Sequence, residues 1–266
     1  MLVKTKELLG FKLGARDGEI GRLKDFYCDD QTWTVRYLVA DTGGWLPHRK
    51  VLISPFAVTG LHPHPRKVVE LNLSKKQIEQ SPSIETHQPV SRHFEKQYLQ
   101  YYGWPDYWPG PLLWGPVDFP GPYLPVAGAS DSRSRPASEE EDSHLRSVTE
   151  VAGFQGYLVQ GLDRAFGHIE EFIIDDHNWA VRYLVADTRN WWPGKRVLLA
   201  LQWIAWVSWP EARVYVDLDR DTILRAPAYE SANELTREYE QQLFEYYNRP
   251  PYWEVELKRA QSFGSA

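Results

Sequence analysis

The sequence predicts a mainly β protein built from two small antiparallel β-barrels in tandem, each closed by a C-terminal helix. Two observations lead to this fold class: a long internal repeat, and short β-type runs that are separated by turn residues. Residues 29–52 return 146 residues later as residues 175–198, and 15 of these 24 positions are identical. A unit repeated over this length indicates two domains of one fold.

Strands are expected at corresponding places in both repeats. Residues 21–28 and 33–41 alternate in hydrophobicity and are rich in β-branched and aromatic side chains. In the second run Trp33, Val35, Tyr37 and Val39 fall on one face. Residues 29–32 are turn-forming, so the two runs predict a hairpin. Further strands are predicted at residues 50–54 and 67–71, and in repeat 2 at residues 196–199 and 213–218.

A helix is expected to close each repeat. Residues 231–234, Ser-Ala-Asn-Glu, have the pattern of a capping box. Large apolar side chains then recur at helical spacing, at Leu235, Tyr239, Leu243 and Tyr246 in repeat 2 and at Phe94, Tyr98 and Tyr101 in repeat 1. Gly103 and Asn248 stand where a left-handed residue ends a helix, and each is followed two residues later by proline.

Composition changes mark the expected domain boundaries. Repeat 1 with its helix covers residues 1–108, and repeat 2 with its helix covers residues 147–256, followed by a tail at 257–266. The linker between them, 109–146, has two parts. Residues 109–127 are rich in proline and aromatic residues and should lie against a folded surface, whereas residues 128–146 are small, polar and charged and should be disordered.

Charge and cysteine content restrict the function classes. Residues 1–108 carry 15 Lys+Arg and 12 Asp+Glu, a net charge of +3, whereas residues 147–266 carry 12 and 18, a net charge of −6. A dense basic face is missing from this pattern, so direct nucleic-acid binding is not expected. The single cysteine, Cys28, permits no intrachain disulfide, and the N-terminal residues have no signal-peptide pattern. The apolar run at 197–210 is too short for a membrane-spanning helix. We therefore expect a cytoplasmic protein without a transmembrane segment, although peripheral membrane association stays open.

The shared motifs resemble the PRC-barrel family. They are Asp-Asp-x-x-Trp-x-Val-Arg-Tyr-Leu-Val-Ala-Asp-Thr, then Trp-x-Pro, then Lys/Arg-Val-Leu, and a closing Tyr-Tyr-x-x-Pro-x-Tyr-Trp, over residues 8–108 and 150–253. The family includes the cytoplasmic barrel of the photosynthetic reaction-centre H subunit, the C-terminal barrel of a ribosome maturation factor and stand-alone prokaryotic proteins. The resemblance implies a β-barrel that assembles with other macromolecules, in a bacterial or other prokaryotic cell. This chain is most similar to the stand-alone tandem type.

The polar residues kept in both repeats admit two interpretations. Arg36 with Asp41, and Arg182 with Asp187, could form a charge clamp in an active site, but their duplication favours structural ion pairs or hydrogen bonds to turns. Likewise, Asp29-Asp30 and Asp175-Asp176 could bind a hard cation, but acidic residues at a hairpin turn commonly bond the local backbone. We favour the structural interpretation for both sets.

Other chemistry is weakly indicated. His62-Pro63-His64-Pro65 is a short histidine run that could bind a metal, but a solvated loop is favoured because cysteine and helical glutamate partners are missing from this stretch. The sequence has no Gly-x-Ser-x-Gly motif and no phosphate-binding loop, and Cys28 lies in a predicted strand. We expect no enzyme activity, no cofactor and no metal site.

Tryptophans distinguish repeat 2 from repeat 1. Trp203, Trp206 and Trp209 stand where repeat 1 has Ala57, Gly60 and Pro63, and Trp191 and Trp192 lie nearby in the sequence. They could fill the core or the contact between the barrels. Alternatively, they form a binding surface for an extended proline-rich segment, such as residues 109–125 of the same chain or a partner.

These observations favour a non-catalytic scaffold or protein-interaction module that binds another protein or itself. A peripheral component of a photosynthetic or electron-transport membrane complex, with a role like that of the H subunit, is the alternative. A ribosome or RNA assembly factor is a third hypothesis, which the acidic charge balance disfavours.

Overall fold

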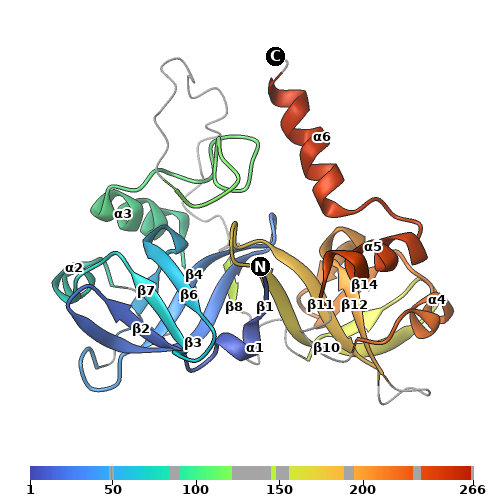
Figure 1. The fold of residues 1–266 in the computed structure, drawn as a ribbon, viewed down its shortest axis with the longest axis horizontal. Coiled ribbons are helices and arrows are strands. Elements are labelled where there is room, and N and C mark those ends of the chain that lie inside the picture. Colours follow the sequence, from blue (N-terminus) through green and yellow to red (C-terminus); the bar gives the residue numbers. More distant parts are fainter. Residues whose placement is uncertain are drawn as a thin grey trace. The chain divides into compact units, whose positions relative to one another are not determined.

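The computed structural model describes residues 1–47, 49, 51–83, 90–121, 145–147, 156–188, 195–229 and 235–264. These residues group into two compact units (Figure 1). Unit 1 comprises the described residues within Met1, Lys6–Gly153 and Asp175–Ala180. Unit 2 comprises those within Leu2–Thr5, Phe154–Ile174 and Val181–Ala266.

Unit 1 is built mainly from repeat 1. Its strands are β2 (Lys12–Ala15), β3 (Gly18–Asp29), β4 (Thr34–Asp41), β5 (Val51–Ile53), β6 (Val58–His62), β7 (Val68–Leu71) and β8 (Leu145–Ser147). Its helices are the short 3-10 turn η1 (Pro55–Ala57), α2 (Lys75–Gln80) and α3 (Arg92–Tyr102); α1 (Thr5–Leu8) precedes β2. The sheet has the strand order β5-β4-β3-β2-β7-β6, and β8 pairs with β3.

Unit 2 repeats this plan. Its strands are β1 (Leu2–Lys4), β9 (Leu158–Gln160), β10 (Ala165–Asp175), β11 (Val181–Asp187), β12 (Arg196–Ala200), β13 (Ile204–Ser208) and β14 (Arg213–Val216). Its helices are η2 (Leu201–Trp203), α4 (Arg220–Arg225), α5 (Arg237–Tyr246) and α6 (Tyr252–Gly264). The strand order β12-β11-β10-β9-β14-β13 matches that of unit 1, so the sequence repeat is a repeat of topology.

The mainly β class is confirmed, but an entirely antiparallel arrangement is wrong. β2 pairs with β7 in parallel, and β9 pairs with β14 in parallel. The reason is that β6 and β7 form a hairpin whose second strand returns beside β2 in the same direction. Within the described strands each sheet is an open path whose two end strands are not paired with each other, so closure into a barrel is not shown.

The predicted hairpin is present in both units, with the turn that the acidic residues suggested. β3 pairs with β4, and the Asp29 carboxylate accepts the backbone N–H groups of Gln31 at 2.9 Å and Thr32 at 3.2 Å. Trp33 does not begin the strand as predicted. Its φ of 52° places it in the turn, as does the φ of 61° at the equivalent Trp179.

Strand β4 is buried along almost its whole length. Every residue from Thr34 to Ala40 is buried, and only Asp41 at the end of the strand is exposed. The strand lies in the middle of the sheet and helix α3 adds a second layer, because Tyr37 packs edge-on against Tyr98 of that helix. Both faces of this strand are therefore covered.

Each sheet is completed by a strand from the sequence that precedes the other repeat. In unit 1, β8 runs antiparallel to β3, with Leu145 opposite Asp29. In unit 2, β1 pairs with β10, and the Thr5 hydroxyl donates to the Phe172 carbonyl at 3.2 Å. The expectation of disorder at 128–146 is therefore wrong for residues 145 and 146, while residues 128–144 lie outside the described part. The units also do not coincide with the boundaries predicted at residues 108 and 147.

Both closing helices are present, but α5 begins later than predicted, at Arg237. Ser91 caps α3 by accepting the backbone N–H of Phe94, and Thr236 caps α5 by accepting that of Tyr239. The proposed capping box at 231–234 lies outside the described residues, and Leu235 precedes the helix. The predicted helix ends are confirmed, because Gly103 has φ 70° and Asn248 has φ 50°.

The segments that follow the closing helices differ between the units. The proline-rich segment packs in unit 1 as far as residue 121, and its Trp114 is fully buried against Phe56 and Tyr107. In unit 2 the corresponding chain continues as α6, which covers much of the segment expected to be a tail.

Candidate functional site

The two repeated arginines are buried, and each has its own set of partners. In unit 1, Arg36 is 2% exposed and bonds the Asp29 carboxylate at 3.3 Å and the Leu113 carbonyl at 2.7 Å. Its guanidinium also lies 3.8 Å from the ring centre of Tyr107, as a cation–π contact. In unit 2, Arg182 forms an ion pair with Glu256 and lies 4.1 Å from the ring centre of Tyr252.

The aspartates that the sequence paired with these arginines lie elsewhere. Asp41 is exposed at the end of β4 and accepts the backbone N–H of Gly43 at 3.0 Å. Asp187 ends β11, opposite Arg196 in the register. The arginines therefore find Asp29 and Glu256 as carboxylate partners, which are a turn residue and a residue of α6.

A buried glutamate on each closing helix joins the shared tyrosines. In unit 1, Glu95 of α3 accepts hydrogen bonds from the hydroxyls of Tyr37 and Tyr107, and Arg92 lies 3.2 Å from it. Burial raises the pKa of Glu95 to about 7, against the opposing effect of Arg92.

Unit 2 repeats the arrangement around Glu240 of α5. Tyr183 donates to it at 2.7 Å and Tyr252 at 3.1 Å, while Arg237 lies at 3.4 Å. Sequence reasoning missed Glu95 and Glu240. The signal that could have found them is the spacing Arg-x-x-Glu, which occurs at the same place in both closing helices.

These clusters are suited to holding the fold together. In each unit the cluster links a central strand, the closing helix and the Tyr-Trp motif that follows, and its charged groups are mutually paired. Burial raises the pKa of Tyr37 and Tyr183, so these phenols keep their protons and act as hydrogen-bond donors.

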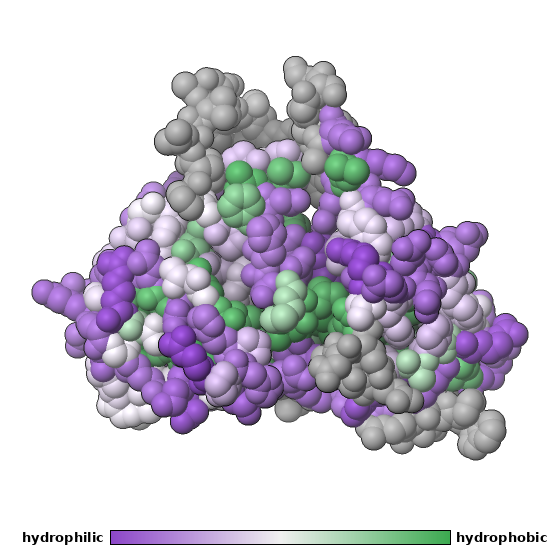
Figure 2. Space-filling view, in the orientation of Figure 1, coloured by the Kyte–Doolittle hydropathy of each residue, from purple (hydrophilic) through white to green (hydrophobic). Residues whose placement is uncertain are grey.

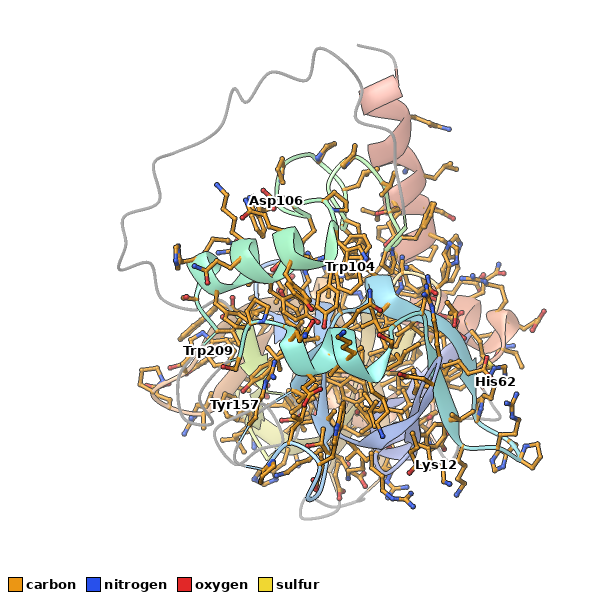
Figure 3. The ribbon with its side chains drawn as sticks, turned by 90° about the vertical axis from the view of Figure 1, so that its left-hand side faces the viewer. Lys12, His62, Trp104, Asp106, Tyr157 and Trp209 are labelled. Carbon is orange, nitrogen blue, oxygen red and sulfur yellow. The ribbon has the colours of Figure 1, made fainter. Side chains whose placement is uncertain are left out.

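The tryptophans of repeat 2 lie in different environments, so they do not form one cradle. Trp203 is 2% exposed and packs against Phe244 and Tyr247 at the closing helix, with ring centres 5.4 and 4.4 Å away. Trp209 is partly exposed, next to Tyr157 at 6.0 Å (Figure 3). Trp206 is 52% exposed. Trp191 and Trp192 lie outside the described residues.

A binding surface for the proline-rich segment was the second of the two interpretations of these tryptophans. The described residues of that segment, 109–121, pack in unit 1 instead, where Trp114 fills a site between Phe56 and Tyr107. This contact explains why the segment is rich in aromatic residues. Residues 122–125 lie outside the described part.

Trp206, which is exposed, and Tyr215, which is partly exposed, form an aromatic platform on the β13–β14 hairpin. They are directly opposite in the register, and their rings stack with centres 3.9 Å apart and planes 7° apart. The Tyr215 hydroxyl donates to Glu211 at 2.9 Å, and this hydrogen bond raises the pKa of Tyr215. A hydroxyl and a carboxylate therefore border a flat apolar surface. We name Trp206 and Tyr215 the aromatic platform.

At the positions equivalent to the aromatic platform, unit 1 has other residues. The equivalent register pair on the β6–β7 hairpin is Gly60 opposite Glu70. The parallel neighbour strands confirm the equivalence, because Glu70 pairs with Gly14 and Tyr215 with Gln160, the residue 146 positions after Gly14. Sequence reasoning identified Trp206 by its difference from Gly60 but missed Tyr215, which only the strand register places beside it.

Other large apolar side chains are exposed as well. Hydrophilic residues cover much of the face in Figure 2. Among the described residues of unit 2, the large apolar side chains that are exposed are Leu162, Trp206, Tyr246, Val255 and Leu257. Trp206 is the one of these that stacks on a neighbouring ring to form a flat surface, which makes it the strongest candidate for a contact with a partner.

The remaining candidates supply little chemistry. Cys28 is 1% exposed, and burial raises the pKa of its thiol. His62 lies 3.2 Å from Glu70, and in the described part of the chain His, Cys, Asp and Glu form no group of three or more that could hold a metal.

No protein-family model matches the chain, and no curated protein matches it. Among the helices of the described part, none combines the length and the apolar character that crossing a membrane requires.

Proposed function

We propose that this protein is a non-catalytic interaction module of the PRC-barrel type, which binds a protein partner through the aromatic platform. The observation that carries the proposal is the stacked pair Trp206 and Tyr215, which repeat 2 exposes at a position where repeat 1 has glycine and glutamate. Residues kept in both repeats account for folding, so the residues that differ are the candidates for function.

Physical chemistry favours this surface as a protein contact. Tryptophan and tyrosine bury a large apolar area with little loss of conformational entropy, and they are enriched among the residues that dominate binding energy. The stack holds the indole flat before a partner arrives, which lowers the entropic cost of binding. The neighbouring Glu211 supplies a hydrogen-bond acceptor at the rim.

The repeated polar residues support a non-catalytic role. Arg36 and Glu95 are buried and hydrogen-bonded to other parts of unit 1, as Arg182 and Glu240 are in unit 2. Side chains held in this way give a strand and a helix a fixed relation. The PRC-barrel resemblance of the repeated motif agrees with assembly rather than catalysis.

The proposal is tested by affinity capture with matched variants. The bait proteins are the wild type, Trp206→Ala and the control Leu162→Ala, which removes a side chain that is 70% exposed outside the platform. We expect a partner captured by the wild type to be retained by the control and reduced at least about tenfold by Trp206→Ala. Equal capture by all three baits would contradict a role for the platform.

A further inference from the structure

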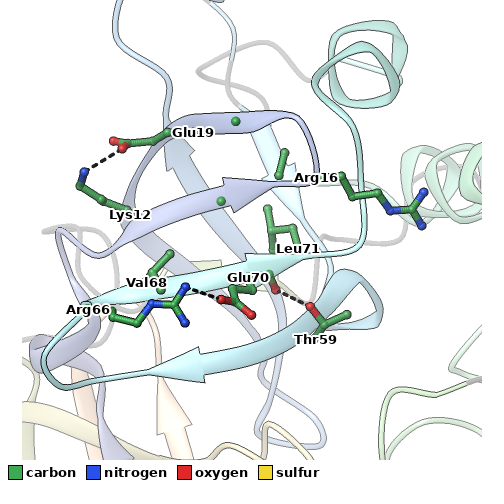
Figure 4. A pocket seen from close by; sticks show the side chains of 11 residues that line it. Lys12, Arg16, Glu19, Thr59, Arg66, Val68, Glu70 and Leu71 are labelled. Atoms are coloured by element: carbon green, nitrogen blue, oxygen red, sulfur yellow. Dashed lines mark hydrogen bonds and ion pairs between the residues drawn. The ribbon is translucent and has the colours of Figure 1, made fainter.

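Unit 1 has a hollow on one face of its sheet. The equivalent face of the sheet in unit 2 carries the aromatic platform. The volume of the hollow is about 450 Å³, and β2, β3, β6 and β7 line it (Figure 4). Gly14 and Gly18 leave its floor without side chains. Charged side chains form the rim: Lys12, Arg16, Glu19, Arg66 and Glu70.

At two positions that line the hollow, repeat 1 has glycine where repeat 2 has a long side chain. Gly14 and Gly18 correspond to Gln160 and Arg164. The volume of the hollow lies within the range of pockets that hold small ligands.

The hollow and the platform have complementary charge. Three cationic and two acidic side chains line the hollow, so it carries one positive charge in excess. Lys12 pairs with Glu19 at 3.0 Å and Arg66 with Glu70 at 2.9 Å, whereas Arg16 bonds the neutral side chain of Asn72. The platform has Glu211 at its edge, and the repeats as wholes have opposite net charges of +3 and −6.

We propose that the hollow of unit 1 receives the Trp206 side chain of a second copy of this chain. The proposal rests on the proposed function and names the partner. Val68 and the glycine floor offer an apolar surface to the indole, and Arg66 at the rim offers a cation for its ring face. The contact joins two different surfaces, so each copy keeps one hollow and one tryptophan for further copies.

Sedimentation velocity over a wide range of protein concentration tests the proposal. Wild-type protein should self-associate with rising concentration. Trp206→Ala removes the inserted side chain, and Gly14→Gln fills the hollow with the residue that unit 2 has at the same position. A Cβ atom at Gly14 would lie 3.5 Å from Val68, an ordinary contact, so this variant should fold. Each change should weaken self-association at least about tenfold, and Leu162→Ala should not.

A mixture of the two variants gives the sharpest outcome. The Trp206→Ala chain keeps its hollow and the Gly14→Gln chain keeps its tryptophan, so together they should form a complex that neither forms alone. Arg66→Glu, which reverses a rim charge on a side chain that is 61% exposed, gives an independent test if Gly14→Gln unfolds.

Three results would overturn the proposal: a wild type that stays monomeric, a mixture of folded variants that does not associate, or self-association that both hollow variants leave unchanged. If Trp206→Ala still abolishes capture of another protein, the proposed function stands while the self-contact fails.

Discussion

At the scale of single residues, the equivalent arginines of the two repeats pair with carboxylates from different parts of the fold. Arg36 pairs with Asp29 of its own hairpin, and Arg182 pairs with Glu256 of α6. A buried charge that lost its partner would cost several kcal/mol, so each site requires a carboxylate, although the position of that carboxylate is free to vary. The repeated Arg-Tyr dipeptide is thus a fixed element of the fold with an adaptable partner.

Glu95 makes the stability of unit 1 depend on pH. Its pKa is about 7 in the folded protein against a usual value of 4.5. The raised pKa means that this group's contribution is fully present below pH 4.5, decreases as the pH rises and is lost above about pH 7. At 1.36 kcal/mol for each pH unit, the difference amounts to about 3 kcal/mol.

Urea unfolding at pH 5 and at pH 8 measures this effect. The wild type should lose about 2–3 kcal/mol more between these pH values than Glu95→Gln, which cannot titrate. The control Glu79→Gln replaces an exposed carboxylate on α2 and should behave as the wild type does. A pH dependence that Glu95→Gln leaves unchanged would assign the effect to other groups.

Truncation of Trp203 should destabilise the protein far more than truncation of Trp206. Trp203→Ala removes a buried side chain and should lower the free energy of unfolding by about 3–5 kcal/mol. Trp206→Ala removes a half-exposed one and should lower it by about 1 kcal/mol. Trp203→Phe should be tolerated better than Trp203→Ala, because the indole N–H finds no acceptor among the described residues. Chemical denaturation of the three variants provides the measurement, and equal losses for both alanine variants would refute the assignment.

At the scale of elements, local pattern predicts the hairpins and helix ends, whereas long-range pairing is not encoded locally. The turn at Asp29 and the left-handed residues Gly103 and Asn248 follow from the preferences of the residues themselves. In contrast, β1 and β8 are three residues long, and their partners lie far away in the sequence. Nothing in such short segments indicates which sheet they join.

The placement of β1 in the sheet of unit 2 leads to a testable prediction. From sequence order alone, one would expect a deletion in β1 to affect unit 1. A deletion of Leu2–Thr5 that keeps Met1 should weaken unit 2, although the deleted residues precede repeat 1. The deletion removes the buried Val3, worth about 1.5–3 kcal/mol, and the Thr5 hydroxyl that accepts the Phe172 N–H.

Hydrogen exchange followed by mass spectrometry locates this effect. Amides of β10 should exchange faster after the deletion, and amides of β4 should not. Thr5→Val keeps β1 but removes the hydroxyl, so it should affect Phe172 more than the rest of β10. Faster exchange in β4 together with unchanged exchange in β10 would contradict the pairing of β1 with β10.

At the scale of the whole molecule, one topology occurs twice with different outer faces. The six-strand order, the buried glutamate and the Tyr-Trp motif are common to both units. The outer faces of the equivalent hairpins differ, with a charged hollow in unit 1 and the aromatic platform in unit 2. The repeated sequence therefore predicts the fold class well. It predicts the site in part, since the difference between repeats identifies Trp206 but the strand register is needed to find Tyr215.

The most direct test replaces the aromatic platform on the β13–β14 hairpin with the residues that unit 1 has at the equivalent positions. In the double variant Trp206→Gly and Tyr215→Glu, both residues become those at the same register positions in unit 1. The loss of a stacked pair and the flexibility of glycine should lower the free energy of unfolding by about 2 kcal/mol without changing the circular dichroism spectrum.

Partner capture and self-association, measured on this folded variant, should both fall at least about tenfold. A folded variant that binds as the wild type does would contradict the claim that the residues the repeats share build the fold and the residues they do not share carry the function.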